Sequence, residues 1–174
     1  MQFSEGQIVV HPHHGPCTVA GTSTRTIRGV DTRYIDLAVH ASAMNICVPL
    51  SNAEEVGLRE VLDAEGLEKL LDVLRAPTGH VETGWSRRFK DNVDQLRTGD
   101  LLLTARVVRD LIRRQAEKGL SWGEKDLLKH ARQPVVTELA LALHLTGEEA
   151  EGALEEAILH GVAPADRQAV AAAS

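Results

Sequence analysis

The apolar residues of this chain change their spacing near residue 50, and this change divides the chain into two parts. Before it, apolar and β-branched residues form short runs or alternate with polar residues, a pattern typical of strands. After it, apolar residues recur every three or four positions, as in amphipathic helices. The sequence therefore predicts an α+β protein in which a small β domain precedes a helical domain.

The first part carries four strand-like runs, at residues 8–10, 18–20, 34–39 and 46–48. Turn-forming residues separate them, with His14-Gly15-Pro16 after the first run and Gly29 in the turn at residues 28–31. Four or five strands in about 50 residues leave no room for a crossover helix. They indicate a small antiparallel barrel or curled sheet, and one edge of such a sheet stays open for docking.

The second part shows the apolar stripes and caps of five or six helices. We expect the first around the apolar stripe Leu67, Leu70, Leu71 and Leu74, ended by Ala76-Pro77, and the others near residues 83–97, 100–118, 121–133, 135–145 and 146–160. Pro134 is expected to bend or restart the path, because proline removes a backbone donor inside a helix. We expect a β domain over residues 1–55, a helical domain over 56–160 and a disordered tail over 161–174.

No motif of a known catalytic class occurs in the chain. His11, His13 and His14 form the only metal-like cluster, and it lacks a further ligand at metal spacing, so we interpret it as a polar turn. Cys47 lies in a strand-like run without a basic neighbour, which predicts a buried structural thiol rather than a nucleophile. We therefore expect no enzymatic activity, no metal and no cofactor.

No apolar run is long enough to span a membrane, and the two cysteines form no disulfide framework, so we expect a protein of the reducing cytoplasm.

The charge is divided unevenly along the chain. The formal net charge is −6, but residues 85–133 contain 12 basic and 7 acidic side chains, a local charge of +5. Overall acidity argues against non-specific nucleic-acid binding, which depends on neutralising phosphates. The basic block still allows a small, directed contact.

An aromatic residue lies beside three cations at the start of this block, in Trp85-Ser86-Arg87-Arg88-Phe89-Lys90. Cations and helix N–H groups bind phosphate, and an indole can stack on or wedge into a base step. Trp85 also shares an apolar stripe with Phe89, however, so the pattern alone favours a core tryptophan. Arg106, Arg109 and Arg113 are predicted on one helix face, as a solvated face or a phosphate track.

Several stretches of the chain together resemble the CarD/CdnL family of bacterial transcription regulators. The family's β module is also related to the polymerase-interacting domain of transcription-repair coupling factors. The matching stretches are residues 6–15, 24–29, 48–49 with 52–54, 73–77, 85–90, 107–111 and 119–121 with 123–125, in the same order and with similar spacing. The resemblance covers about residues 3–160.

The resemblance implies a Tudor-like β domain that docks on the RNA polymerase β subunit and a helical domain that contacts promoter DNA near the −10 element. There a tryptophan wedges into the minor groove at the upstream edge of the melted bubble and stabilises the open complex. The residues implied in polymerase binding are Arg25, Thr26, Ile27 and Cys47. The residues implied in DNA binding are Trp85, Ser86, Arg87, Arg88, Lys90 and Arg109. We expect a monomer with weak affinity for free DNA.

This chain departs from the family pattern at several positions. Cys47 stands where family members commonly have an arginine, His11 replaces a common tyrosine, Pro134 enters a helix that usually lacks it, and the end of the chain is more acidic. Two hypotheses therefore remain. The first is a polymerase-binding regulator of promoter opening; the second is a polymerase- or repair-factor-binding module without effective promoter contact.

Overall fold

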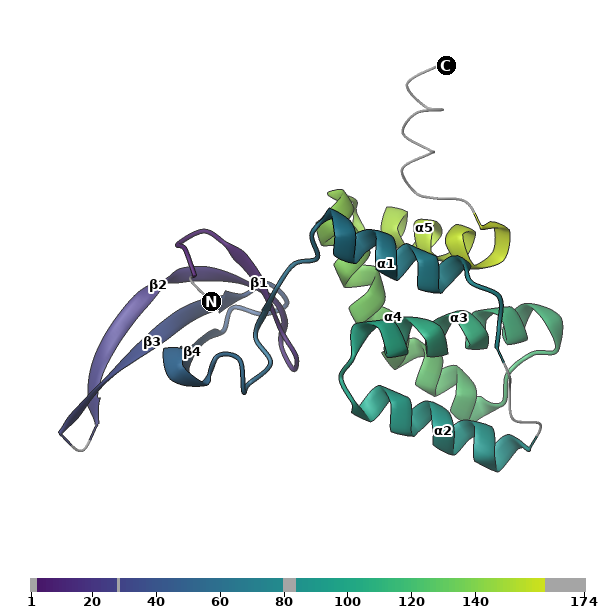
Figure 1. Cartoon of the computed structure of the whole chain (residues 1–174), viewed down its shortest axis with the longest axis horizontal. Helices are drawn as coiled ribbons and strands as arrows, with labels where there is room; N and C mark the ends of the chain where they lie inside the picture. Colours follow the sequence, from purple (N-terminus) through teal and green to yellow (C-terminus); the bar gives the residue numbers. More distant parts are fainter. Residues whose placement is uncertain (1–2, 28, 80–83, 162–174) are drawn as a thin grey trace, which may run out of the picture. The chain divides into compact units, whose positions relative to one another are not determined.

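The computed structural model describes residues 3–27, 29–79 and 84–161, which form two compact units. The first unit is Met1–Val61 and the second is Leu62–Ser174, shown in Figure 1 as a β part and a helical part. The boundary lies six residues beyond the expected one, because Arg59–Glu60 still pairs with the sheet. Apart from Gly161, the tail expected over 161–174 lies outside the described residues.

The first unit is one antiparallel sheet of five strands in the order β4-β3-β2-β1-β5. The strands are β1 (Ile8–His11), β2 (Gly15–Ile27), β3 (Val30–Val39), β4 (Asn45–Pro49) and β5 (Arg59–Glu60), with the short 3-10 helix η1 (Leu50–Asn52) after β4. The long strands β2 and β3 form a curved hairpin (Figure 1). The predicted fold class, a small antiparallel β domain followed by an all-helical domain, is confirmed.

The two faces of this sheet differ because side chains alternate along each strand. On β3, Ile35, Leu37 and Val39 are buried, whereas Tyr34 and Asp36 lie on the outer face. The buried residues pack with their cross-strand neighbours into one apolar cluster: Val9, Cys17, Val19, Val48, Ala53 and Leu58. The register between β2 and β3 shifts between Val19 and Gly21, an irregularity typical of a β-bulge, which increases the local twist.

The described residues of the second unit, 62–79 and 84–161, form five helices. They are α1 (Ala64–Arg75), α2 (Trp85–Arg97), α3 (Leu101–Glu117), α4 (Trp122–Leu143) and α5 (Gly147–His160). Asp63 and Asp100 cap α1 and α3 by accepting a hydrogen bond from a first-turn N–H. Complete capping boxes begin α4, at Ser121 and Glu124, and α5, at Thr146 and Glu149.

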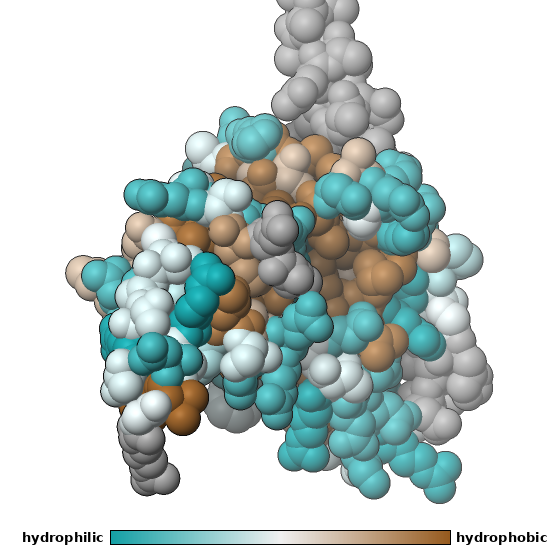
Figure 2. Space-filling model, turned by 60° about the vertical axis from the view of Figure 1, so that its left-hand side comes forward, coloured by the Kyte–Doolittle hydropathy of each residue, from teal (hydrophilic) through white to brown (hydrophobic). Residues whose placement is uncertain are grey.

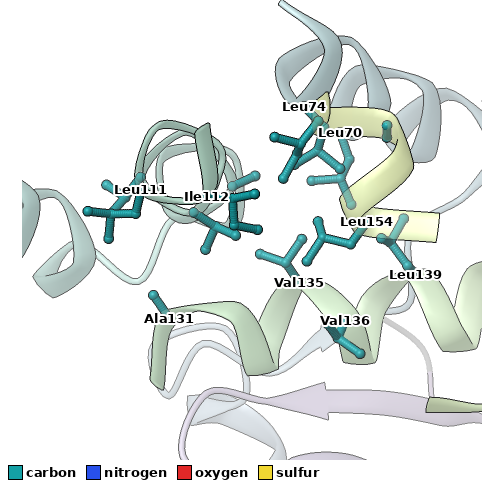
Figure 3. Close-up of a cluster of buried hydrophobic side chains, with 14 of the residues drawn as sticks. Leu70, Leu74, Leu111, Ile112, Ala131, Val135, Val136, Leu139 and Leu154 are labelled. Carbon is teal, nitrogen blue, oxygen red and sulfur yellow. The ribbon is translucent and has the colours of Figure 1, made fainter. Parts of the chain in front are cut away.

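The apolar stripes of α1, α3, α4 and α5 form the core of this unit. Figure 3 shows Leu70 and Leu74 of α1 pointing toward Leu154 of α5 and Val135 of α4. These four side chains are completely buried. Burial of side chains of this size contributes about 1.5–3 kcal/mol each, so the cluster fixes the helix arrangement. α2 has only one buried residue, Arg88, and packs on α3 and α4 at the edge of this core.

The expected interruption at Pro134 is wrong. α4 runs without a break through Pro134, so five helices form rather than six. The proline is exposed, whereas Ala131, Val135 and Leu139 around it are buried in the core. An interior proline costs about 3 kcal/mol, and the burial of several apolar side chains on the opposite face outweighs this cost.

Candidate functional site

Arg25 and Cys47 meet on the outer face of the sheet. The guanidinium Nη2 of Arg25 donates to the Cys47 Sγ over 3.1 Å, and the guanidinium carbon lies 5.3 Å from the centre of the Tyr34 ring. Because Cys47 pairs with Asp36 across β4 and β3, the Asp36 carboxylate lies on the same face. The strand register thus joins β2, β3 and β4 into one surface of a cation, an aromatic ring, a carboxylate and a thiol.

Cys47 is exposed, so the expectation of a buried thiol at this position is wrong. Its position on the strand explains this, because Ile46 and Val48 occupy the inward-facing positions on either side. The neighbouring Asp36 carboxylate, an acceptor for the thiol proton, raises the pKa of Cys47. The thiol therefore stays protonated near neutral pH, which argues against a nucleophilic role.

Thr26 and Ile27 lie on opposite faces of the β2–β3 hairpin. Thr26 donates from Oγ1 to the Asp31 Oδ1 over 2.6 Å, on the face opposite Arg25. Ile27 pairs with Val30 and both are exposed, by 50% and 64%. Figure 2 shows apolar side chains at this lower end of the hairpin. The structure thus brings together Arg25, Ile27 and Cys47 of the sequence-predicted docking residues, and separates Thr26 from them.

Trp85 is neither a core residue nor a free surface residue. It is the first residue of α2 and is 50% exposed. Its ring stacks on Phe89 with centroids 5.5 Å apart and an interplanar angle of 20°. Its Nε1 donates to the Ser121 Oγ over 3.1 Å, which fixes the orientation of the indole. One face of the Trp85 indole thus packs against Phe89, while about half of the side-chain surface stays accessible to a partner.

Ser121 is held by a network of buried polar groups. Its hydroxyl donates to the Glu124 Oε2 over 2.9 Å and accepts from the Glu124 N–H and from Trp85, so it uses one donor and two acceptors. Glu124 is 1% exposed, and its Oε1 accepts from the Nε of Arg88 over 2.9 Å. Sequence reasoning identified this capping box but not its contact with Trp85.

The pKa of Glu124 reflects two opposing effects. Burial by itself raises this pKa, but hydrogen bonds from Ser121 and Arg88 and the charge of Arg88 outweigh burial. The net pKa therefore lies below the usual value for a glutamate. Glu124 is charged at neutral pH and forms a stable partner for Arg88.

Arg88 and Arg109 do not fit the expected contact with DNA phosphates. Arg88 is only 7% exposed because it forms the ion pair with Glu124. Arg109 is 4% exposed; it donates to the Asp110 carboxylate over 2.8 Å and to the Val73 carbonyl over 2.9 Å. Both guanidinium groups are buried and paired inside the helical unit. We therefore assign Arg88 and Arg109 structural roles in place of the expected contact with DNA.

The three arginines predicted on one face of α3, Arg106, Arg109 and Arg113, form neither a solvated face nor a phosphate track. Only Arg106 is exposed, whereas Arg113 donates to the last carbonyls of α1, including Ala76 over 2.7 Å. Orphan carbonyls at a helix C-terminus attract cations, so Arg109 and Arg113 together stabilise the end of α1. The periodicity of α3 could not reveal these partners, because they lie about 36 residues away in sequence.

Besides Trp85, the predicted DNA-binding residues that remain accessible on α2 are Ser86, Arg87 and Lys90. Within the described residues, neither Arg87 nor Lys90 has an ion-pair partner. Sequence reasoning missed Trp122, which follows Ser121 and is 84% exposed. A signal was present, since Trp122 lies off the buried stripe that contains Leu128, Ala131 and Val135.

Metal ligands and a charged ligand pocket are not evident in the described part of the chain. No group of three or more His, Cys, Asp or Glu side chains there could hold a metal ion. An open groove of about 920 Å³ lies along α2 and α3. Its lining mixes Asp91 and Asp94 with Arg106 and Lys118, so it favours no single sign of ligand charge.

Within the same described residues, no helix is long and apolar enough to cross a membrane.

Comparison with known proteins places both units in one family. Residues 3–62 match the CarD-like/TRCF RID domain, and residues 69–155, half of the chain, match the CarD C-terminal domain. The chain therefore belongs to the CarD-like transcription factors, a family of RNA polymerase-interacting regulators that are generally not enzymes.

Two individual proteins give the scale of the similarity. The putative transcription factor YdeB of Bacillus subtilis is 26% identical over 147 residues, which cover 84% of this chain and 96% of YdeB. The solution structure of the 72-residue N-terminal domain of Myxococcus xanthus CarD is 22% identical. That comparison has a TM-score of 0.30 and covers 34% of this chain and 79% of the CarD domain.

Proposed function

We propose that this protein docks on the β subunit of RNA polymerase through its β unit and stabilises the open promoter complex through Trp85. The observation that carries the proposal is the state of Trp85, which is half exposed yet fixed by its bond to Ser121. A preorganised aromatic side chain loses little conformational entropy when it inserts into a base step. Such a regulator acts in the cytoplasm, at the nucleoid, as a monomer.

The docking step uses the hairpin face and the free edge of the sheet. Among the described residues, β4 pairs only with β3, so its outer edge presents unpaired backbone groups. Arg25 and Cys47 lie beside that edge, and Ile27 adds an exposed apolar side chain. An edge for strand addition flanked by a cation suits a partner with an acidic strand edge.

The promoter contact depends on tethering. Arg87 and Lys90 lie two and five residues after Trp85 and remain free to bind phosphates. Two such cations on a chain with a net charge of −6 give weak binding to free DNA. Docking on polymerase raises the effective concentration of the helical unit at the promoter, which makes a weak contact sufficient.

The docking step is tested with two charge reversals on the same hairpin. Arg25→Glu changes the face that carries Cys47, whereas Arg33→Glu makes the same change on the opposite face, where Arg33 pairs with Thr24. In binding of the full chain to core polymerase, Arg25→Glu should weaken affinity by at least ~5-fold, about 1 kcal/mol. Arg33→Glu should bind normally. Equal effects of the two variants, or no effect of either, would show that the face carrying Arg25 and Cys47 does not bind polymerase.

A second candidate function is a polymerase-binding module without effective promoter contact. The burial of Arg88 and Arg109 favours it, because it leaves fewer cations available for phosphates than the sequence suggested. This candidate shares the docking step and differs only at Trp85. Weaker polymerase binding by Arg25→Glu, together with an unchanged open-complex lifetime for Trp85→Ala, would therefore support it.

A further inference from the structure

Trp122 presents an almost bare indole at the start of α4. It is 84% exposed, the largest value among the large hydrophobic residues that the structure describes. Single exposed apolar side chains are common on protein surfaces, so exposure alone assigns no role to Trp122. The residues around Trp122, on α2 and on the first turns of α4, indicate what it binds.

The first turn of α4 lies against the aromatic side of α2. Ser121, directly before Trp122, accepts the hydrogen bond from the Trp85 indole. Gly123, directly after it, lies so close to Phe89 that a Cβ atom there would be 3.4 Å from the ring. Trp122 therefore borders the surface that presents Trp85, and the two tryptophans are the only ones in the chain.

The charges around Trp122 favour an anionic partner. Lys125 and Lys129 follow at i+3 and i+7, which places them on the same face of α4, and both are exposed. Asp126 lies on this face as well, 3.7 Å from the His130 side chain. With Arg87 and Lys90 of α2, the exposed aromatic groups are accompanied by four cations that have no ion-pair partner among the described residues.

We propose that Trp122 is a second nucleic-acid contact, which stacks on an unpaired base of the melted strand while Lys125 and Lys129 bind the adjoining phosphates. This inference rests on the proposed function, because the Trp85 wedge at the edge of the bubble is what brings a melted strand to this surface. The Trp122 indole has no side-chain hydrogen-bond partner in the part of the chain that the structure describes, and such an indole suits stacking on any base rather than reading of base edges. Trp122 would thus extend the contact without adding sequence specificity.

The test uses the full chain with RNA polymerase and promoter DNA. Trp122→Ala, Trp122→Phe and Trp85→Ala are compared with wild type, and Leu159→Ala serves as a control for loss of an exposed apolar side chain, since Leu159 is 43% exposed on α5. The measurements are the lifetime of competitor-resistant open complexes, the affinity for core polymerase and the melting temperature. Trp122→Ala should shorten the lifetime by ~5-fold or more, with unchanged polymerase affinity and melting. Trp122→Phe should retain most of the lifetime, because it keeps an aromatic face, and Leu159→Ala should retain all of it.

The outcomes separate this inference from the function on which it rests. A short lifetime with Trp85→Ala and a normal one with Trp122→Ala would overturn the role of Trp122 alone. Normal lifetimes with both variants would overturn both proposals. Weaker polymerase binding by Trp122→Ala would show that Trp122 contacts protein, which also overturns the nucleic-acid contact.

A base-removal experiment checks the stacking itself. Abasic sites are placed one at a time along each strand at the upstream edge of the bubble. With wild type, one abasic position should shorten the lifetime, and with Trp122→Ala the same position should have no further effect. Fully additive effects at every position would contradict a stack between Trp122 and an unpaired base.

Discussion

The Arg88 guanidinium and the Glu124 carboxylate form a buried ion pair that joins α2 to the first turn of α4, with Nη2 and Oε1 2.9 Å apart. Glu124 also holds Ser121, and Ser121 orients Trp85. The accessible indole at the start of α2 therefore depends on a polar network whose charged members, Arg88 and Glu124, are buried. Arg88, Glu124 and Ser121 therefore hold Trp85 in place, whereas Trp85 itself is the residue proposed to contact a partner.

Adjacent arginines should respond differently to truncation. Arg88→Ala removes the nearer of the two cations at the buried Glu124 and leaves Arg114 at 3.6 Å, so it should lower the free energy of unfolding by about 1.5–3 kcal/mol. Arg87→Ala removes an exposed side chain and should change stability by less than about 0.5 kcal/mol. Urea unfolding of both variants measures the difference, and similar values would show that Arg88 is not a structural residue.

The low pKa of Glu124 predicts a dependence of stability on pH. A carboxyl group whose pKa is lower in the folded state stabilises the fold above its unfolded pKa, about 4.3 for glutamate. This contribution is lost as the pH falls through the lower, folded pKa. The stability advantage of wild type over Glu124→Gln should therefore be complete at pH 7 and decline below about pH 4.3. An advantage that stays constant down to pH 3 in urea unfolding would contradict the assignment.

The two capping boxes offer a matched pair of variants. Ser121→Ala and Thr146→Ala each remove an N-cap and should each cost about 0.5–2 kcal/mol in the free energy of unfolding. Only Ser121→Ala also frees the Trp85 indole. We expect increased quenching of tryptophan fluorescence by acrylamide in Ser121→Ala and none in Thr146→Ala, with the Trp122→Phe background isolating Trp85 as the emitter. Equal quenching in both variants would deny Ser121 an orienting role.

The sequence predicted the order of β and helical units because strand alternation and helical periodicity are local patterns. The family resemblance also singled out Trp85 and Arg25, whose side chains the structure places at the surface, whereas the strand pattern wrongly predicted a buried Cys47. The sequence could not predict the burial of Arg88 and Arg109, because Glu124 and the Val73 carbonyl come close only in the folded chain. Pro134 was misjudged for a related reason: the local cost of proline was visible, but the burial of the residues around it was not.

Cys47 offers a gain-of-function test of docking. The Cys47 Sγ already lies 3.1 Å from the Arg25 guanidinium, and the Asp36 carboxylate lies on the same face. Cys47→Arg adds a second cation beside the free edge of β4, and Asp36 offsets part of its repulsion from Arg25. Affinity for core polymerase should rise by about 1 kcal/mol, or ~5-fold, if an acidic group faces this edge. Cys47→Ser is the control, since it changes the side chain without adding charge. If Cys47→Arg binds no better than Cys47→Ser, no acidic group of polymerase faces Cys47.

The central claim, that Trp85 stabilises the open promoter complex, is tested most directly by the decay of competitor-resistant complexes with Trp85→Ala. Because Trp85 is half exposed, the substitution should leave the melting temperature nearly unchanged and polymerase affinity intact. A lost stacking contact of ~1–3 kcal/mol should shorten the lifetime of the open complex by ~5–150-fold. An unchanged lifetime, with normal melting and normal polymerase binding, would contradict the claim and favour a docking module without promoter contact.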